Sequence, residues 1–139
     1  STVAAWSDNS VPTGVAFDNQ GNTYVSFLSH FPFTPGSARV ERWSNGSGEV
    51  VADGLTMVTD VAIGPDGSLY VLEIAHNGLL SGDPTGALIR VDQDGSRAVI
   101  ASDGLTMPTG VAIRDGNAYV SNCGVCADIG EVVAIQLPG

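Results

Sequence analysis

One segment of this 139-residue chain occurs three times. Each copy contains a Val-Ala dipeptide, a Gly-containing turn and a Tyr-Val dipeptide, in that order. The copies are Pro12–Ser26, Val58–Leu72 and Pro108–Ser121, with offsets of 46 and then 50 residues between their starts. A period of this length is typical of proteins built from repeated structural units. The identical strings Asp53–Met57 and Asp103–Met107 repeat at the 50-residue offset, so chance does not explain the pattern.

Short apolar stretches separated by turn residues predict β-strands in every copy. The first two strands form a hairpin around Asp18–Gly21, Pro65–Gly67 and Asp115–Gly116. Third strands are expected within Ala38–Trp43, Ala87–Asp92 and Glu131–Leu137, and fourth strands within Glu49–Ala52 and Arg97–Ala101. Four antiparallel strands in a repeat of this length are typical of one blade of a β-propeller. The sequence therefore predicts an all-β propeller fold without helices.

The repeats predict that residues 1–139 form a single repeat domain. This domain would consist of three blades of four strands each. Blade 1 is expected at residues 10–53, blade 2 at 54–103 and blade 3 at 104–139, where blade 3 lacks its fourth strand. Val3–Trp6 precedes Pro12 by about the distance that separates the fourth strand of blade 1 from Val58. Residues 1–9 are therefore predicted to hold a closing strand that completes an incomplete blade.

Three blades do not close a ring, because propellers need four to eight. A half-propeller would leave two apolar blade faces and an open strand edge uncovered. We expect a homodimer that forms a six-bladed ring, in which Val3–Trp6 of one copy pairs with residues 131–136 of the other. The alternatives are a complementary half-propeller as partner, a longer polypeptide of which this is half, and a fragment or designed half-propeller that self-assembles.

The charge balance narrows the possible partners. The chain has 15 acidic residues, five arginines and no lysine, for a net charge of −10. Phosphate backbones and anionic membranes attract the opposite sign, so we expect neither nucleic-acid binding nor membrane insertion. Without lysine, Schiff-base chemistry and a P-loop are also excluded.

Two segments carry a resemblance to known proteins. The string Gly104–Ile113, which contains Pro-Thr-Gly-Val-Ala-Ile, and Ser68–Val71 resemble NHL-like repeats, and more narrowly the ScyD/ScyE family. The chain is similar to about half of a six-bladed member. The resemblance implies a secreted propeller, extracellular or periplasmic, and implies little about chemistry.

Long loops after the second strands are the expected recognition surface, because they differ in sequence while the strands repeat. Their apolar side chains would line a groove or tuck each loop onto its own blade. The loops are Phe27–Ser37, Glu73–Gly86 and Asn122–Gly130, and the apolar residues are Phe27, Leu28, Phe31, Phe33, Leu79 and Leu80. We therefore expect a binding or interaction scaffold without an evident catalytic constellation and without a cofactor.

Histidine and cysteine residues occupy matching positions in these loops. His30 and His76 each follow the repeated Tyr by six residues, and the third copy places Cys123 and Cys126 around that position. A His/Cys zinc site and solvent-facing loop residues are the two alternatives for the histidines. In a secreted protein the two cysteines are expected to form a disulfide that braces the loop, and free thiols are the alternative. No helix follows that would depress a thiol pKa for redox catalysis.

Three oxygen-bearing side chains support an enzymatic alternative. Asp60 replaces the glycine found at positions 14 and 110, and Glu73 and Asn122 directly follow the second strands. In gluconolactonase-like propellers, which this fold resembles in outline, a Glu, an Asn and an Asp hold one divalent cation. The alternative function is therefore a metal-dependent hydrolase or lactonase with calcium or another divalent cation at the channel mouth. The candidate ligand-binding residues are Asp60, Glu73, Asn122, His30 and His76.

Overall fold

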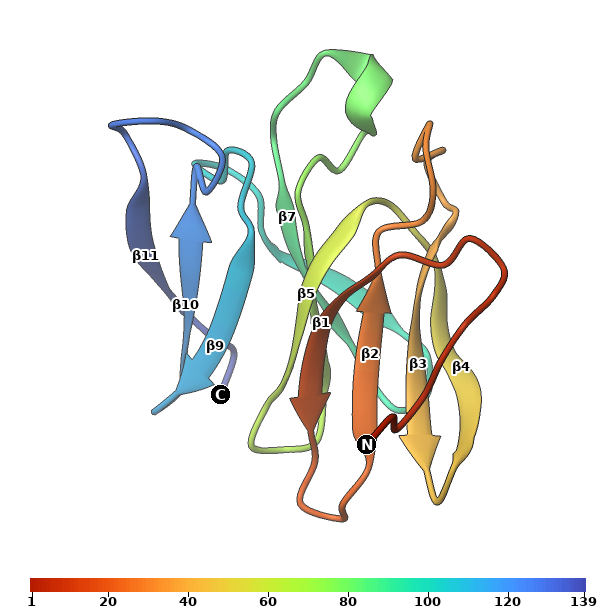
Figure 1. Cartoon of the computed structure of the whole chain (residues 1–139). Helices are drawn as coiled ribbons and strands as arrows, with labels where there is room; N and C mark the ends of the chain where they lie inside the picture. The colour runs from red at the N-terminus through yellow and green to blue at the C-terminus, as the bar shows by residue number, and fades with distance from the viewer.

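The computed structural model describes residues 1–139 and contains strands and one short 3₁₀ helix, η1, at Leu79–Ser81. The strands form three antiparallel sheets, which we call blades 1, 2 and 3 (Figure 1). Blade 1 consists of β1 (Pro12–Phe17), β2 (Thr23–Phe27), β3 (Ala38–Ser44) and β4 (Ser47–Leu55). Blade 2 consists of β5 (Val58–Ile63), β6 (Leu69–Glu73), β7 (Ala87–Val91) and β8 (Arg97–Ala101). Blade 3 has three strands, β9 (Gly110–Arg114), β10 (Asn117–Asn122) and β11 (Glu131–Gln136).

The hairpin turns form because polar side chains bind the backbone of the turn. In the β1–β2 turn, Asp18 accepts hydrogen bonds from the amides of Gln20 and Asn22, both at 2.9 Å. Gly21 has φ +86°, a left-handed conformation that glycine adopts without steric cost. The turn sets the strand register, which pairs Ala16 with Tyr24. Local chemistry of this kind explains why the sequence predicts the hairpins.

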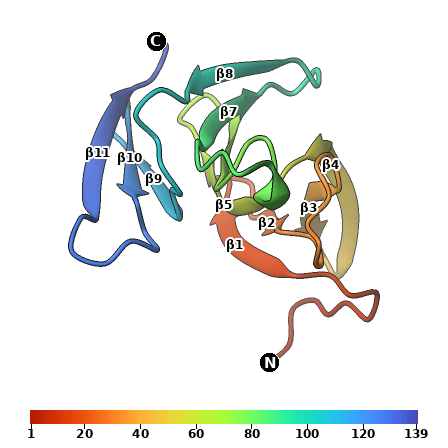
Figure 2. The same cartoon turned by 90° about the horizontal axis from the view of Figure 1, so that it is seen from above.

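The three blades stand side by side around their first strands, β1, β5 and β9 (Figure 2). Two apolar layers hold them together. The layer between blades 1 and 2 includes Val40, Ala52, Leu55, Val61, Val71 and Ile89. The layer between blades 2 and 3 includes Tyr70, Leu72, Leu88, Ala118, Val120 and Leu137. Each blade is thus stabilised by the face of its neighbour rather than by a core of its own.

Three details differ from the sequence-based expectations. β4 runs to Leu55 and so crosses the expected boundary at residue 53, because Leu55 is buried in the layer between blades 1 and 2. The loop after β6 contains η1, although no helix was expected. Val3–Trp6 forms no strand within one chain, so its pairing with β11 of another copy stays a prediction. No helix of the protein is long and apolar enough to cross a membrane.

The N-terminal segment lies across the face of blade 1 that points away from blade 2. The Trp6 ring meets the rings of Phe27 and Trp43 edge to face, at centroid distances of 5.1 and 5.6 Å. Its indole N–H donates to Glu41 Oε1 at 3.0 Å. This segment therefore covers part of a face that has no neighbouring blade.

Candidate functional site

All three long loops, β2–β3, β6–β7 and β10–β11, emerge at the same end of the molecule, which is at the top in Figure 1. We call this the loop end. One of its polar features is the pair formed by Glu73 and His76. The Glu73 side chain is 2% exposed, whereas His76 is about half exposed. A buried carboxylate and an accessible imidazole therefore lie side by side at the surface of blade 2.

Glu73 is fixed by two neighbours on different segments. Its Oε2 accepts a hydrogen bond from the Thr56 amide at 2.6 Å, and its Oε1 lies 2.5 Å from His76 Nδ1. The Thr56 hydroxyl in turn accepts from the Gly36 amide at 3.0 Å, which ties in the β2–β3 loop. With Nδ1 held by the carboxylate, Nε2 of His76 is the ring nitrogen left to meet a ligand.

Asn122 repeats this arrangement in blade 3. Its Oδ1 accepts from the Thr106 amide at 2.7 Å, and its Nδ2 donates to the Gly104 carbonyl and to Glu131. Thr56 and Thr106 are the same residue of the repeated Asp-Gly-Leu-Thr-Met string. The side chain that ends the second strand thus braces the linker into its own blade in both repeats.

Asp60 links two other segments, the first strands of blades 2 and 3. Its two oxygens accept hydrogen bonds from the amides of Val61 and Val111, both at 2.9 Å. The second bond joins β5 to β9, the first strands of blades 2 and 3. Burial raises the pKa of Asp60 above its ordinary value of 3.8, although the two hydrogen bonds oppose the rise. A Cβ at Gly14 would come within 2.3 Å of the carboxylate, which explains why blade 1 has glycine there.

Of the five candidate residues, only Glu73 and His76 contact each other. Asp60, Glu73 and Asn122 each bind a different backbone amide. No group of three or more His, Cys, Asp or Glu side chains is placed to hold a metal ion. His30 is exposed in the β2–β3 loop and has no carboxylate partner like that of His76.

Apolar side chains at the loop end fall into two groups. Phe33 and Leu28 pack on the small cluster of Met57, Ile74 and Ala75. Phe31 and Leu80 lie in two of the loops and are largely exposed. The loop end therefore combines anchoring residues with apolar residues that are free to meet another molecule.

The β10–β11 loop contains a disulfide between Cys123 and Cys126. The Cys126 amide also donates to the Cys123 carbonyl at 2.9 Å. Because both sulfurs are engaged, neither cysteine contributes a thiolate to a metal site or a nucleophile.

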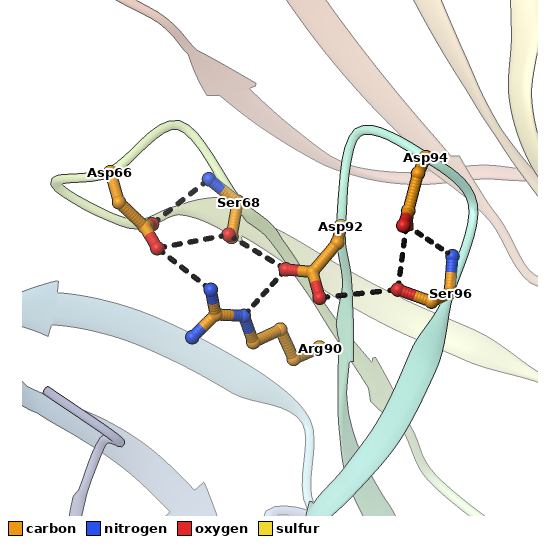
Figure 3. Close-up of polar contacts among 6 residues, drawn as sticks. All are labelled: Asp66, Ser68, Arg90, Asp92, Asp94 and Ser96. Atoms are coloured by element: carbon orange, nitrogen blue, oxygen red, sulfur yellow. Dashed lines mark hydrogen bonds and ion pairs between the residues drawn. The ribbon is translucent and has the colours of Figure 1, made fainter.

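At the opposite end of blade 2, an aspartate-rich network holds the hairpin turns together (Figure 3). Arg90 donates to Asp92 at 2.7 Å and to Asp66 at 2.8 Å. Its other members are bound across and within the two turns: Ser68, Asp94 and Ser96. Hydrogen bonds from Ser68, Arg90 and Ser96 lower the pKa of Asp66, Asp92 and Asp94, respectively. The Asp92 and Asp94 side chains of the Asp92–Gly95 string are therefore engaged in turn contacts.

Sequence reasoning missed two features that the structure brings together. One is the Glu41 carboxylate, which binds Trp6, Trp43 and Arg39. The other is a contact between blades, in which the Thr13 hydroxyl donates to the Val58 carbonyl at 2.9 Å. The second had a visible signal, because every repeat carries a Thr at this position. The Glu41 contacts had no such signal, because Glu41, Trp6, Trp43 and Arg39 do not recur at matching positions of the repeats.

Known structures place this geometry in a wider context. The chain superposes on a structural-genomics target whose description reads "putative gluconolactonase", with TM-score 0.62 and 23% identity over 91% of this chain and 49% of the other. It also superposes on a gluconolactonase from Xanthomonas campestris (TM-score 0.62, 20% identity, 93% and 44% of the two chains). The protein has a β-propeller-type fold.

A protein of unknown function from Bacteroides caccae gives TM-score 0.57 and 14% identity over 96% of this chain and 48% of the other. The chain thus spans about half the length, or less, of these solved structures. No protein-family model and no curated protein matches it by sequence. The similarities support a propeller fold, and not the NHL-like or ScyD/ScyE assignment in particular.

Proposed function

We propose that this chain is a binding or interaction scaffold whose recognition surface is the loop end. The observation that carries the proposal is that Glu73 and Asn122 both bind a backbone amide of a linker between blades. Both side chains hold a linker amide, at 2.6 and 2.7 Å, and so stiffen the loops instead of opening a shared cation cage. Rigid loops lose less conformational entropy on binding. His76, Phe31 and Leu80 are then the exposed contact groups.

We also propose that the protein is a secreted propeller with NHL-like repeats, similar to the ScyD/ScyE family. A disulfide between Cys123 and Cys126 supports an extracellular or periplasmic location, because such bonds persist in oxidising compartments. We further propose that the chain is a half-propeller that another half completes to a six-bladed ring. The matched propellers, about twice as long, support this proposal.

Probe mapping by NMR tests the scaffold proposal. Isotope-labelled protein would be titrated with phenol, isopropanol and glucose, three probes that differ in polarity. We expect shift changes in the β2–β3 and β6–β7 loops, and smaller changes in a Phe31→Ser, Leu80→Ser double variant. Changes confined to the hairpin turns at the opposite end would overturn the proposal.

A lactonase-like hydrolase is the second candidate. Its support is the fold shared with a gluconolactonase and with a protein described as a "putative gluconolactonase", together with the pair formed by Glu73 and His76. A carboxylate on Nδ1 orients the imidazole, so that Nε2 would act as a general base towards water or hold a divalent cation. In the cation version, Asp60, Glu73 and Asn122 would supply the oxygen ligands of calcium.

Two measurements separate the candidates. The scaffold proposal expects no stoichiometric metal in protein purified without chelator, and no hydrolysis of gluconolactone above the buffer rate. Hydrolysis that is lost in His76→Gln and kept in His30→Gln would instead establish the enzyme. His30 is a suitable control because it occupies the same repeat position without a carboxylate partner. A cation that disappears in Asp60→Asn would establish the cation version.

A further inference from the structure

The repeats allow the end faces of the chain to be compared with its internal interfaces. Tyr70 and Tyr119 occupy the same repeat position. Tyr70 is 2% exposed because it packs against blade 3, whereas Tyr119 is 41% exposed. Blade 3 therefore presents, on its free face, the residue that blade 2 buries in an interface.

The neighbouring strand shows the same contrast. Leu72 pairs with Leu88 in blade 2, and Ser121 pairs with Val132 in blade 3, so Leu88 and Val132 are equivalent. Leu88 is 0% exposed and Val132 is 72% exposed. The free face of blade 3 has the composition of an interface that lacks its other half.

The free face of blade 1 supplies a matching recess. A groove of about 360 Å³ runs between the N-terminal segment and β1. Apolar side chains line most of it, among them Val3, Trp6, Val15, Phe17 and Trp43. Val15 and Phe17 are equivalent to Val61 and Ile63 of blade 2, which pack on blade 1 within the chain. The groove thus lies where a preceding blade would insert its side chains.

A repeated hydrogen bond marks the inner edge of each interface. The Thr13 hydroxyl donates to the Val58 carbonyl at 2.9 Å, and the Thr59 hydroxyl to the Pro108 carbonyl at 3.3 Å. The next members of the series are the hydroxyl of Thr109, directly before β9 of blade 3, and the carbonyl of Pro12, the first residue of β1 in blade 1. Neither group meets its counterpart within residues 1–139, so each is available to another half of the ring.

The outer edge shows the same complementarity. β11 forms the edge of a three-stranded sheet, and Val3–Trp6 lies on blade 1 without a partner strand. Trp6 stands six residues before Pro12, as Ala52 of β4 stands before Val58. Ala52 packs between blades 1 and 2. The segment therefore occupies the place of the fourth strand of a preceding blade.

We infer that the partner which completes the ring is a second copy of this chain. This inference rests on the proposed half-propeller and names its other half. Both faces needed for one interface are present on the chain, so a two-fold axis generates two identical interfaces and closes the assembly. In each interface Val132 and Tyr119 enter the groove of the other copy, Thr109 donates to its Pro12, and β11 pairs with its Val3–Trp6.

Light scattering on a size-exclusion column tests the inference. We expect the eluting wild-type protein to have a molar mass of twice 14.2 kDa over a wide concentration range. Val132→Lys should give the monomer mass with an unchanged far-UV circular dichroism spectrum. Val99→Lys is the matched control, because Val99 is 57% exposed on the outer strand of blade 2 and stays exposed in the ring. A dimer that persists in Val132→Lys would overturn the inference.

A second pair of variants tests the register of the interface. Thr109→Val should raise the dimer dissociation constant about tenfold or more, since the ring contains the lost hydrogen bond twice. Thr59→Val removes the equivalent bond inside the chain and should leave that constant within about twofold. Equal constants for Thr109→Val and wild type would overturn the predicted contact. A wild-type monomer would overturn the second copy as partner, and leave the scaffold proposal to the probe mapping.

Discussion

The Glu41 carboxylate holds the N-terminal segment on blade 1, and its replacement by glutamine has a calculable effect. Oε1 accepts the indole N–H groups of Trp6 and Trp43 at 3.0 and 2.9 Å, and Oε2 accepts Arg39 Nε at 2.6 Å. A glutamine oxygen can keep both indole bonds, but its NH₂ group then faces Arg39. The variant Glu41→Gln therefore loses one charge-assisted hydrogen bond.

Such a bond contributes about 1.5–3 kcal/mol in a buried setting. Arg39 is about a quarter exposed, and solvent weakens the pair, so we expect a loss of about 1–2 kcal/mol in the free energy of unfolding. In urea this corresponds to a midpoint lower by about 0.5–1 M. The assay is tryptophan fluorescence, since Trp6 and Trp43 are the two tryptophans of the chain and both contact Glu41.

The pH dependence gives an independent check. Burial alone would raise the pKa of Glu41, but the hydrogen bonds from Arg39, Trp43 and Trp6 outweigh it and lower that pKa below 4.5. The stabilisation is therefore present above pH 4.5 and is lost as the pH falls through the lowered pKa. Glu41→Gln lacks this acid-sensitive part.

The control is Glu49→Gln on β4, which weakens an exposed ion pair with Arg42. It should change the unfolding free energy by no more than about 0.5 kcal/mol. All variants are compared at one protein concentration. A Glu41→Gln protein as stable as Glu49→Gln, or one with the acid dependence of the wild type, would refute the proposed role of Glu41.

Three further predictions concern the loop end and the inner strands. Glu73→Ala should lower stability by about 1–3 kcal/mol in urea unfolding, because the Thr56 amide loses its acceptor; an unchanged midpoint would mean that the brace contributes nothing. The raised pKa of Asp60 means that its charge opposes folding increasingly as the pH rises above 3.8. The stability of the wild type relative to Asp60→Asn should therefore fall as the pH rises from 3.8 through the raised pKa, and a constant difference would contradict this. Gly14→Ala places a methyl group 2.3 Å from the Asp60 carboxylate and should cost about 1–3 kcal/mol by thermal unfolding, unless the carboxylate moves aside without loss.

The strands and turns were predictable because their causes are local. The hairpin at Asp18–Gly21 follows from an aspartate that binds nearby amides and a glycine with positive φ. The strand alternation follows from residues such as Val15 and Val25, which pair on one face. The β4 end at Leu55 was not predictable, because its position depends on packing against blade 2.

The candidate site was predictable in part. Matching repeat positions predicted that Glu73 and Asn122 are related residues, and the structure gives them the same contact with the Thr of the linker. That they bind a ligand stays a prediction. Their binding to backbone amides, in place of direct contact with Asp60, could not be foreseen. Which amide each side chain binds depends on how the linker between two blades folds over the end of the blade.

The sequence by itself determined the three repeats, the strand order within each blade and the position of the long loops, since these depend on turn chemistry and alternation over a few residues. Only the tertiary structure decided which distant groups meet. Glu41 binds a tryptophan 35 residues away, and Asp60 binds an amide 51 residues away. Both contacts arise where separate segments are pressed together by apolar burial, which is non-directional and leaves no pattern for its polar partners in the chain.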